Sequence, residues 1–414
     1  MRIIIAGGGA AGFFGAISAA NQNPEAEIIL LEASHKPLQK VRISGGGRCN
    51  VTHHCYDPAD LVKGYPRGSK ELLGPYTRFQ ARDTVAWFEK QGVRLKTEED
   101  GRMFPVTDDS ETVVECLLNS ARKLGVRLWL GARVKGVRVS DSNQGRQYEV
   151  ELADGARHLC DKLLLATGSS PPGLKLAESL GHGITPCVPS LFTFKVSDPR
   201  LDGLSGISFE NVHLALTCNE NQVLEQDGAL LITHWGLSGP AVLKLSAWGA
   251  RMLRQCNYHA RLMANFLPDK SAEQIHAELA AFREQNSRKK VRTESPFRIP
   301  ARYWHQMIKL VGIGEDTIWN QLTKNAMNAI VSELTGGIFE ITGKGVFKEE
   351  FVTCGGVNLK EVDFKTMESK ISPGLFLAGE ILDIDGITGG FNFQSAWTTG
   401  WIAGLNMAIP GIRR

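Results

Sequence analysis

The sequence lacks the features that mark several classes of protein. Its 8 cysteines are scattered and never form a Cys-x-x-Cys pair, which disfavours a disulfide-reductase centre and structural zinc. No apolar run approaches the roughly 20 residues that cross a bilayer. The net charge of +3 is too small to indicate nucleic-acid or membrane binding by itself. We therefore expect a globular cytoplasmic protein with reduced thiols, no metal site, no membrane attachment and no stable nucleic-acid complex.

A secretory signal peptide is also not predicted, although Arg2 precedes an apolar stretch that runs to Ala20. Glycines interrupt that stretch, and a strand, a turn and a helix account for it fully. We assign the stretch to the mature fold.

A glycine fingerprint follows the first apolar residues. Residues 2–6 predict a short buried strand, and Gly7, Gly9 and Gly12 follow it in the spacing Gly-x-Gly-x-x-Gly. This spacing permits a sharp turn, a close approach of the backbone to a pyrophosphate, and close packing of a helix on the strand. A helix of small and apolar residues is predicted over 10–22, with its positive end directed at the phosphates.

An acidic residue stands where a dinucleotide ribose would bind. The next predicted strand covers residues 27–32 and ends in Glu32, 20 residues after Gly12. A carboxylate at this position suits the unphosphorylated ribose of FAD or NAD and repels the 2′-phosphate of NADP.

The far end of the chain carries a second glycine-rich signal. Residues 374–380 read Gly-Leu-Phe-Leu-Ala-Gly-Glu, and residues 389–392 read Gly-Gly-Phe-Asn before a helix predicted over 394–408. Glu380 is a candidate acceptor for ribityl hydroxyls, and the helix N-terminus can stabilise the charge of a reduced flavin. The alternative is a glycine turn that caps an ordinary helix. Together the two ends favour FAD over an unspecified dinucleotide.

The segment 44–50 reads Ser-Gly-Gly-Gly-Arg-Cys-Asn and follows the ribose-binding strand. Its backbone N–H groups can surround a pyrophosphate or a flavin ring, with Arg48 and Asn50 as further donors. The alternative is a structural turn in which the glycines only satisfy backbone geometry. Cys49 is a candidate nucleophile or flavin attachment point, but a buried structural thiol is the favoured interpretation.

The pattern along the chain predicts an α/β protein with a Rossmann-type FAD-binding domain interrupted by an insertion. Residues 1–190 and 338–414 are assigned to the FAD-binding domain, and residues 191–337 to an inserted domain with short strands followed by helices, including one over 317–334. A strand predicted over 158–166 ends in a small-residue turn that can pass close to a dinucleotide.

The predicted cofactor-binding residues lie at the ends of predicted strands or in glycine-rich turns. They are Gly7, Gly9, Ala11, Gly12, Glu32, Gly46, Gly47, Arg48, Asn50, Val134, Ala166, Thr167, Gly168, Gly379, Glu380, Gly390, Phe391 and Asn392.

Residues 43–52, with Gly379-Glu380 and residues 386–392, resemble the BaiN-like flavoprotein family, which includes proteins described as aminoacetone oxidases. Residues 233–240 and 353–357 fit the same family, so the resemblance covers nearly the whole chain. It implies a glutathione-reductase-like FAD-binding domain, an inserted domain with a β-barrel-like part and helices, and an oxidoreductase activity. It implies little about the substrate.

The chain departs from that family after Gly168. The family usually carries a longer loop there, of the Tyr-Pro-x-x-Gly-Ser-Thr-Gly kind. This chain instead passes quickly from residues 169–173 into residues 174–180. The shorter loop affects the expected substrate identity more than the expected binding of FAD.

The chemistry beyond FAD leaves several hypotheses open, and no residue is assigned as catalytic. In one cycle NAD(P)H acts as a transient donor and FAD then reduces a small organic substrate; in the other an amine-type substrate reduces FAD and oxygen reoxidises it. His234 is a candidate acid or base and equally a structural residue. The basic run 288–292 supports the alternative that the chain is a flavin-containing RNA-binding or regulatory protein. We favour the interpretation of this run as a solvated linker between helices. An NAD-dependent dehydrogenase is a weaker third hypothesis.

Overall fold

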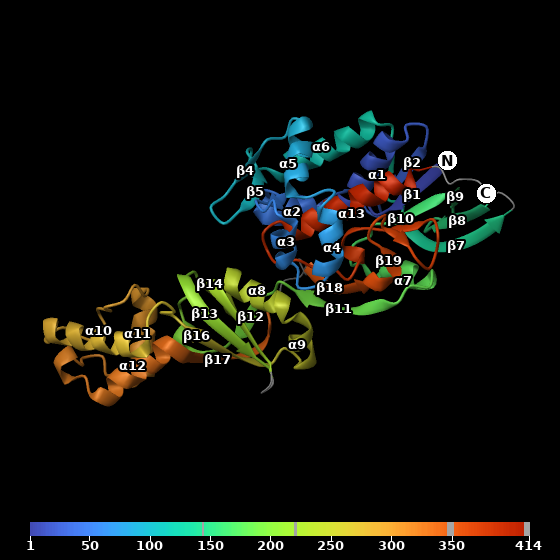
Figure 1. The fold of residues 1–414 in the computed structure, drawn as a ribbon. Coiled ribbons are helices and arrows are strands. Elements are labelled where there is room, and N and C mark those ends of the chain that lie inside the picture. Colours follow the sequence, from blue (N-terminus) through green and yellow to red (C-terminus); the bar gives the residue numbers. More distant parts are fainter. Residues whose placement is uncertain (143–144, 219–221, 346–351, 410–414) are drawn as a thin grey trace. The chain divides into compact units, whose positions relative to one another are not determined.

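The protein was analysed as a computed structural model that describes residues 1–142, 145–218, 222–345 and 352–409. The chain divides into two compact units (Figure 1). The first comprises Met1–Cys187 with Val352–Arg414, and the second comprises Val188–Phe351.

A seven-stranded sheet forms the centre of the first unit, in the order β19-β20-β21-β10-β1-β2-β6. Five of its strands are parallel, and β19 and β20 add an antiparallel edge. The residues Ile3, Ile4 and Ile5 of β1 are fully buried, as expected for an interior parallel strand covered on both faces. The strands are β1 (Arg2–Ala6), β2 (Glu27–Leu31), β6 (Arg127–Trp129), β10 (Lys162–Leu165), β19 (Val362–Asp363), β20 (Glu368–Ser369) and β21 (Leu375–Leu377).

Two helices from opposite ends of the chain pack side by side in this unit (Figure 1). Helix α1 (Ala10–Gln22) has the predicted bounds, and α13 (Phe391–Met407) begins three residues before the predicted start at 394. Gly390, the residue before α13, has a φ of +95°, so the glycine turn itself forms the helix cap. The rings of Phe14 and Trp397 lie 4.8 Å apart across the pair.

The strand predicted over 158–166 is two strands in two sheets. Strand β9 (Arg157–Cys160) pairs with β8 (Gly145–Leu152), and β10 joins the central sheet. The break falls at Asp161, whose carboxylate accepts the backbone N–H of Arg2 at 2.7 Å. The prediction of one continuous strand was therefore wrong at this residue.

The remaining elements of the first unit lie around the central sheet. The helices are α2 (Gln39–Gly47), α3 (Pro58–Leu61), α4 (Ser69–Tyr76), α5 (Ala81–Lys90), α6 (Ser110–Lys123) and α7 (Pro171–Ser179), with 3-10 turns η1 (Val62–Gly64), η4 (Leu359–Glu361) and η5 (Gly379–Ile381). The strands are β3 (Thr52–His53), β4 (Leu95–Thr97), β5 (Arg102–Pro105), β7 (Val134–Ser142), β11 (Ile184–Ser190) and β18 (Val352–Val357).

The second unit contains a closed six-stranded barrel and a group of helices, which confirms the predicted barrel-like and helical insertion. Strand β17 closes the barrel between β12 and β16, whereas the sequence placed residues 338–344 in the FAD-binding domain. The strands are β12 (Phe194–Val196), β13 (Ser208–Thr217), β14 (Val223–Thr233), β15 (Gly236–Ser238), β16 (Ala260–Asn265) and β17 (Gly337–Lys344). The helices are α8 (Pro240–Trp248), α9 (Ala250–Gln255), α10 (Ala272–Gln285), α11 (Ala301–Leu310) and α12 (Lys324–Gly336), with 3-10 turns η2 (Pro199–Leu201) and η3 (Trp319–Gln321).

Helix α12 begins later than the predicted helix over 317–334. The Thr323 hydroxyl accepts the backbone N–H of Ala326 at 3.2 Å, which is an N-cap interaction that fixes the start of the helix at Lys324.

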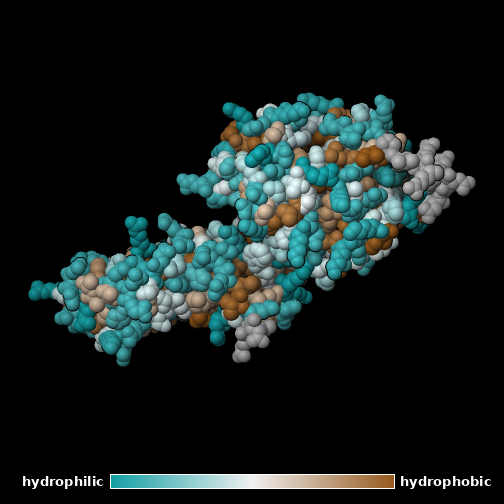
Figure 2. All heavy atoms as spheres, viewed as in Figure 1, coloured by the Kyte–Doolittle hydropathy of each residue, from teal (hydrophilic) through white to brown (hydrophobic). Residues whose placement is uncertain are grey.

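The visible face of the molecule is mostly hydrophilic, with hydrophobic groups interspersed (Figure 2). Among the residues that the structure describes, no helix combines the length and the apolar character needed to span a membrane.

Candidate flavin-binding site

Many of the predicted site residues of the first unit follow strands that end at one edge of the central sheet. Three backbone hydrogen bonds continue the pairing past the strand ends: Gly7 N donates to Leu31 O at 2.8 Å, Ala166 N to Ala6 O at 2.8 Å, and Ala378 N to Leu165 O at 3.2 Å. The turns after β1, β2, β10 and β21 are thereby brought together. In open α/β sheets this is the edge at which ligands bind.

The N-terminal glycine loop has the geometry that its spacing predicts. A β-carbon at Gly7, whose φ is +114°, would lie 2.3 Å from the carbonyl oxygen of Ala166, and one at Gly12 would lie 1.9 Å from that of Gly7. At Gly9 a β-carbon would meet no atom within 4 Å. The loop is therefore packed tightly at Gly7 and Gly12 and open at Gly9.

The N-terminus of α1 fits a phosphate group. Gly9 is its N-cap and supplies no side-chain acceptor, and the first turn contains no acidic residue. No side chain of the N-cap or of the first turn therefore pairs with the first N–H groups of the helix or with its positive dipole end. These features suit a pyrophosphate.

Glu32 is held in a fixed orientation just after β2. One carboxylate oxygen accepts the backbone N–H of Gly8 at 3.0 Å, and the other accepts that of Ser34 at 2.7 Å. The carboxylate therefore lies directly beside the glycine loop, as a ribose-binding acid must.

The glycine triplet forms an open, left-handed turn at the end of α2. Gly45, Gly46 and Gly47 have φ values of +59°, +71° and +86°. Glycine adopts this region without strain, whereas other residues rarely do. β-Carbons at Gly46 and Gly47 would meet no atom within 4 Å, so both residues leave room for a ligand.

Arg48 has protein partners of its own. Its guanidinium pairs with Glu98 at 2.6 Å and lies 4.0 Å from the ring centre of Phe104. The hydrogen bond to Glu98 raises the pKa of Arg48. These contacts fix the turn after the glycine triplet, which gives Arg48 a structural role besides the predicted one.

Cys49 has the character of a structural thiol. It is fully buried, and desolvation raises the pKa of its thiol to about 12. The thiol is therefore protonated at neutral pH and is a poor nucleophile. This supports the favoured interpretation of Cys49.

The segment after the glycine triplet is fastened to the start of α13. The Trp397 indole donates to Val51 O at 2.9 Å, and the Thr52 hydroxyl donates to Gln394 Oε1 at 2.6 Å. Gly390 lies on the backbone of Thr52, where a β-carbon would be 2.5 Å from the carbonyl oxygen. When the Asn50 amide is oriented so that its nitrogen donates to Thr52 O at 3.1 Å, its oxygen accepts the N–H of Gly390 at 3.0 Å.

Asn392 and Phe391 shape the C-terminal glycine turn. The Asn392 amide accepts the N–H of Gly386 at 2.8 Å and donates to its carbonyl at 2.9 Å. The Phe391 ring stacks on His53, with ring centres 4.7 Å apart. Both side chains therefore hold the turn that places the N-terminus of α13, which has no side-chain cap and no acidic residue in its first turn.

The two glycine-rich ends of the chain adjoin each other. A β-carbon at Gly379 would lie 2.8 Å from Cβ of Ala11, and the N–H of Gly379 donates to the Thr399 hydroxyl at 2.9 Å. The Glu380 carboxylate approaches Gly168, where a β-carbon would be 3.9 Å from Oε2.

Two ion pairs at this edge were not predicted from the sequence. Lys40 pairs with Glu380, and Arg67 forms a two-pronged ion pair with the fully buried Asp385. The partners are 340 and 318 residues apart, so only the fold connects them.

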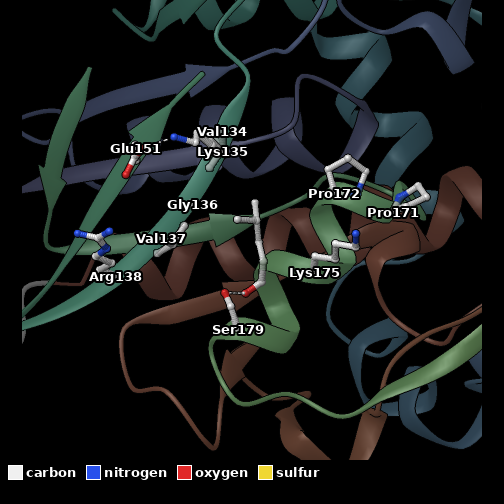
Figure 3. A pocket seen from close by; sticks show the side chains of 11 residues that line it. Val134, Lys135, Gly136, Val137, Arg138, Glu151, Pro171, Pro172, Lys175 and Ser179 are labelled. Carbon is white, nitrogen blue, oxygen red and sulfur yellow. Dashed lines mark hydrogen bonds and ion pairs between the residues drawn. The ribbon is translucent and has the colours of Figure 1, made fainter. Parts of the chain in front are cut away.

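Among the remaining candidates, Val134 lies two residues after Ala132, whose backbone N–H donates to Glu32 O at 2.8 Å. Val134 begins β7 and lines a groove together with Pro171 and Pro172 (Figure 3). These two prolines follow Gly168 closely in the sequence. His234 belongs to the second unit and is exposed to solvent.

Comparison with known proteins identifies the family. The profile described as the HI0933-like protein Rossmann domain matches residues 1–406. A 3-dehydro-bile acid delta(4,6)-reductase of Clostridium scindens is 30% identical over 97% of this chain and 98% of its own. A ribosomal RNA dihydrouridine synthase of Escherichia coli is 30% identical over 96% of each chain.

A solved structure shows the same fold. The 3-ketosteroid-delta4-(5alpha)-dehydrogenase of Rhodococcus jostii RHA1 is 14% identical, with a TM-score of 0.53 over 99% of this chain and 96% of that one. The glycine loop, the acid after β2 and the open triplet fit FAD, and the predicted BaiN-like resemblance is confirmed. The chain belongs to the HI0933-like Rossmann-domain family of FAD-dependent oxidoreductases.

Proposed function

We propose that this protein uses FAD to reduce a carbon–carbon double bond conjugated to a carbonyl group of an organic substrate. The observation that supports this most directly is that both relatives at 30% identity are named for reductions of this kind. The delta(4,6)-reductase acts on a 3-dehydro bile acid, and the dihydrouridine synthase saturates a uracil ring. Their substrates differ, but both reactions add hydrogen to a double bond conjugated to a carbonyl.

Under this proposal, each group of predicted cofactor residues would contact a different part of FAD. FAD, when bound, supplies the hydride chemistry. The N-terminus of α1 and the open backbone at Gly9 would hold the pyrophosphate, and Glu32 would hold the adenosine ribose. Gly46 and Gly47 would admit the flavin without a steric clash. The N-terminus of α13 would stabilise negative charge at the flavin pyrimidine edge.

NAD(P)H is the proposed source of electrons, acting as a transient donor. The sequence has no second Gly-x-Gly-x-x-Gly fingerprint of a dedicated nicotinamide domain. A donor that binds briefly, reduces the flavin and leaves is consistent with this.

The RNA-binding alternative loses part of its support. Within the basic run 288–292, Lys289 pairs with Glu294 at 2.7 Å, Lys290 with Asp316 at 2.7 Å and Arg292 with Glu315 at 2.8 Å. Acidic neighbours thus offset most of its charge, which weakens it as a phosphate-binding surface. RNA therefore enters the proposal as a class of substrate to be tested rather than as a regulatory partner.

An anaerobic half-reaction experiment tests the proposal. The flavin is first reduced with NADH or NADPH, and the reduced protein is then mixed with a steroid 4-en-3-one, with a uridine-containing RNA, or with buffer. We expect the enone or the uridine to restore the oxidised flavin spectrum and to be recovered as the saturated product. The proposal fails if neither compound reoxidises the flavin while amines reduce it, because that result indicates the oxidase cycle.

A further inference from the structure

Residues 64–68 hold the glycine turn that precedes α13. The backbone N–H of Ile387, within that turn, donates to Gly64 O at 2.9 Å. A β-carbon at Gly64 would lie 2.4 Å from Cε1 of Phe391, the first residue of the helix. The two segments are therefore in direct contact, with no room for a side chain at position 64.

The hydroxyl of Tyr65 fastens the first turn of α13. It donates to Phe391 O at 2.5 Å and accepts the hydroxyl of Tyr76. Tyr65 and Tyr76 are buried, and their desolvation raises the pKa of both hydroxyl groups. Both groups therefore stay protonated well into the alkaline range, so the bond to the helix persists there.

A two-pronged ion pair joins the same two segments. Arg67 Nε and Nη2 donate to the two carboxylate oxygens of Asp385, and an antiparallel backbone bridge also links the two residues. The side chain of Asp385 is fully buried, and that of Arg67 is 11% exposed. Desolvation of a buried pair offsets most of its Coulombic attraction, so hydrophobic residues of similar volume often stabilise a fold as well. An effect of the two charges on the neighbouring site therefore explains the pair better than stability does.

The ion pair lies beside the turn at which the flavin ring is proposed to bind. Gly386 follows Asp385, and the amide of Asn392 both accepts the N–H of Gly386 and donates to its carbonyl. A carboxylate in a poorly solvated site opposes the negative charge that a flavin gains on reduction, whereas a guanidinium favours it. The charges of Arg67 and Asp385 offset each other, which leaves the N-terminus of α13 to stabilise the reduced flavin.

We propose that Arg67 and Asp385 are positioning residues that together set the reduction potential of the bound flavin. Their contacts hold the turn before α13, and each charge offsets the effect of the other on the flavin ring. Both residues act through this turn rather than on the substrate. The inference rests on the proposed function in one respect, which is that FAD binds with its pyrimidine edge at the N-terminus of α13.

Midpoint potentials of the FAD-loaded proteins, measured by anaerobic titration with a redox dye, test this. In Asp385→Asn the guanidinium of Arg67, which does not lose its proton, remains without the carboxylate. We expect the potential to rise by about 30 mV or more, which is a tenfold gain in preference for reduced over oxidised FAD. Arg67→Gln/Asp385→Asn removes both charges and should return the potential close to that of the wild type. Asp60→Asn, which breaks an exposed ion pair with Lys63, is the control and should leave the potential unchanged.

Two results would overturn the proposal. In one, Asp385→Asn binds FAD with the potential of the wild type. In the other, its shift persists in the double variant, which assigns the shift to a displaced turn rather than to charge. If Asp385→Asn loses its flavin, Arg67→Gln carries the test at alkaline pH, where the remaining carboxylate should lower the potential and an unchanged potential contradicts the proposal. Oxidation of the reduced flavin by an enone or a uridine is scored separately, so failure of the proposed reaction is distinguishable from failure of this inference.

Discussion

Gly400 on α13 lies so close to Ala11 on α1 that a β-carbon at position 400 would stand 2.5 Å from the Ala11 carbonyl oxygen. One turn further along, a β-carbon at Gly404 would lie 2.4 Å from the carbonyl oxygen of Gly15. The two helices therefore touch through backbone. Because each helix presents its N-terminus to the same edge of the sheet, this contact sets the spacing of two groups of N–H donors.

The contact predicts that Gly400→Ala is destabilising. In an exposed helix, replacing glycine with alanine stabilises by about 0.5–1 kcal/mol. At Gly400 the added methyl group must push the helices apart, at a cost of about 1–3 kcal/mol. Thermal melting should show a lower midpoint for Gly400→Ala, together with reduced FAD content.

Gly74→Ala is the matched control for that substitution. Gly74 also lies within a helix, but a β-carbon there meets no atom within 4 Å. It should leave stability unchanged or slightly raised. Equal melting points for the two variants would contradict the packing argument.

We expect Glu32→Gln to weaken FAD binding by about tenfold or more. Both carboxylate oxygens accept backbone N–H groups, and the amide of glutamine would direct an N–H group at one of those donors. Equilibrium titration of flavin-free protein with FAD measures the change. Glu25→Gln, an exposed substitution beyond α1, should bind like the wild type. An unchanged affinity of Glu32→Gln for FAD would contradict the proposal that Glu32 binds the ribose.

A buried network centred on His182 should stabilise the fold without taking part in chemistry. Its Nδ1 contacts Glu361 Oε2 at 2.9 Å, and its Nε2 contacts the Ser369 hydroxyl at 2.9 Å. The connectivity resembles a hydrolytic triad. However, the Ser369 oxygen accepts two backbone N–H groups, at 3.1 and 2.8 Å, and the residue is 4% exposed.

We therefore expect His182→Ala to lower the free energy of unfolding by about 1–3 kcal/mol, because it leaves buried polar groups without a partner. Denaturant titration measures this, with the exposed His35→Ala as the control. Reaction of wild-type Ser369 with a fluorophosphonate probe would contradict the structural role.

Buried thiols should make the fold sensitive to alkaline pH. Desolvation raises the pKa of Cys49 and of Cys160 to about 12. In the unfolded chain a thiol titrates near roughly 8.5. The stability from the neutral buried thiols is thus fully present below that pH and is lost as pH rises toward the folded-state value, by up to about 1.4 kcal/mol per pH unit for each thiol.

Denaturant titrations at several pH values above neutrality test this expectation. Cys160→Ala should flatten the decline in stability, whereas Cys187→Ala, at an exposed cysteine, should not. If stability declined with pH equally steeply in the wild type, Cys160→Ala and Cys187→Ala, the assignment of this decline to buried thiols would be contradicted.

Local signals predicted much of the fold and of the site. Gly7, Gly9, Gly12 and Glu32 lie within one β-α-β unit, so their spacing in the sequence already encodes their spacing in the fold. Helix α1 was predicted with its observed bounds for the same reason.

Features that depend on distant partners were missed. The break at Asp161 requires its contact with Arg2, and the Arg67–Asp385 pair joins segments 318 residues apart. Strand β17 was assigned to the FAD-binding domain because strand-like sequence resumes near Phe339 and leads to the C-terminal glycine-rich segment. Its alternating pattern alone fits any sheet with one buried face. Only the closure of the barrel shows which sheet it joins.

The FAD content of the wild-type protein and of Gly9→Asp tests the central claim most directly. Gly9 has an extended backbone, with a φ of −94°, and free space at its β-carbon position, so the protein tolerates aspartate there. Aspartate is a favourable N-cap, yet its carboxylate would occupy and repel the proposed pyrophosphate site. We predict that the wild type is purified with stoichiometric FAD, and that Gly9→Asp is folded, melts no lower than flavin-free wild type, and carries none. A folded wild type that never binds FAD, or a Gly9→Asp variant that binds it with unchanged affinity, would contradict the account.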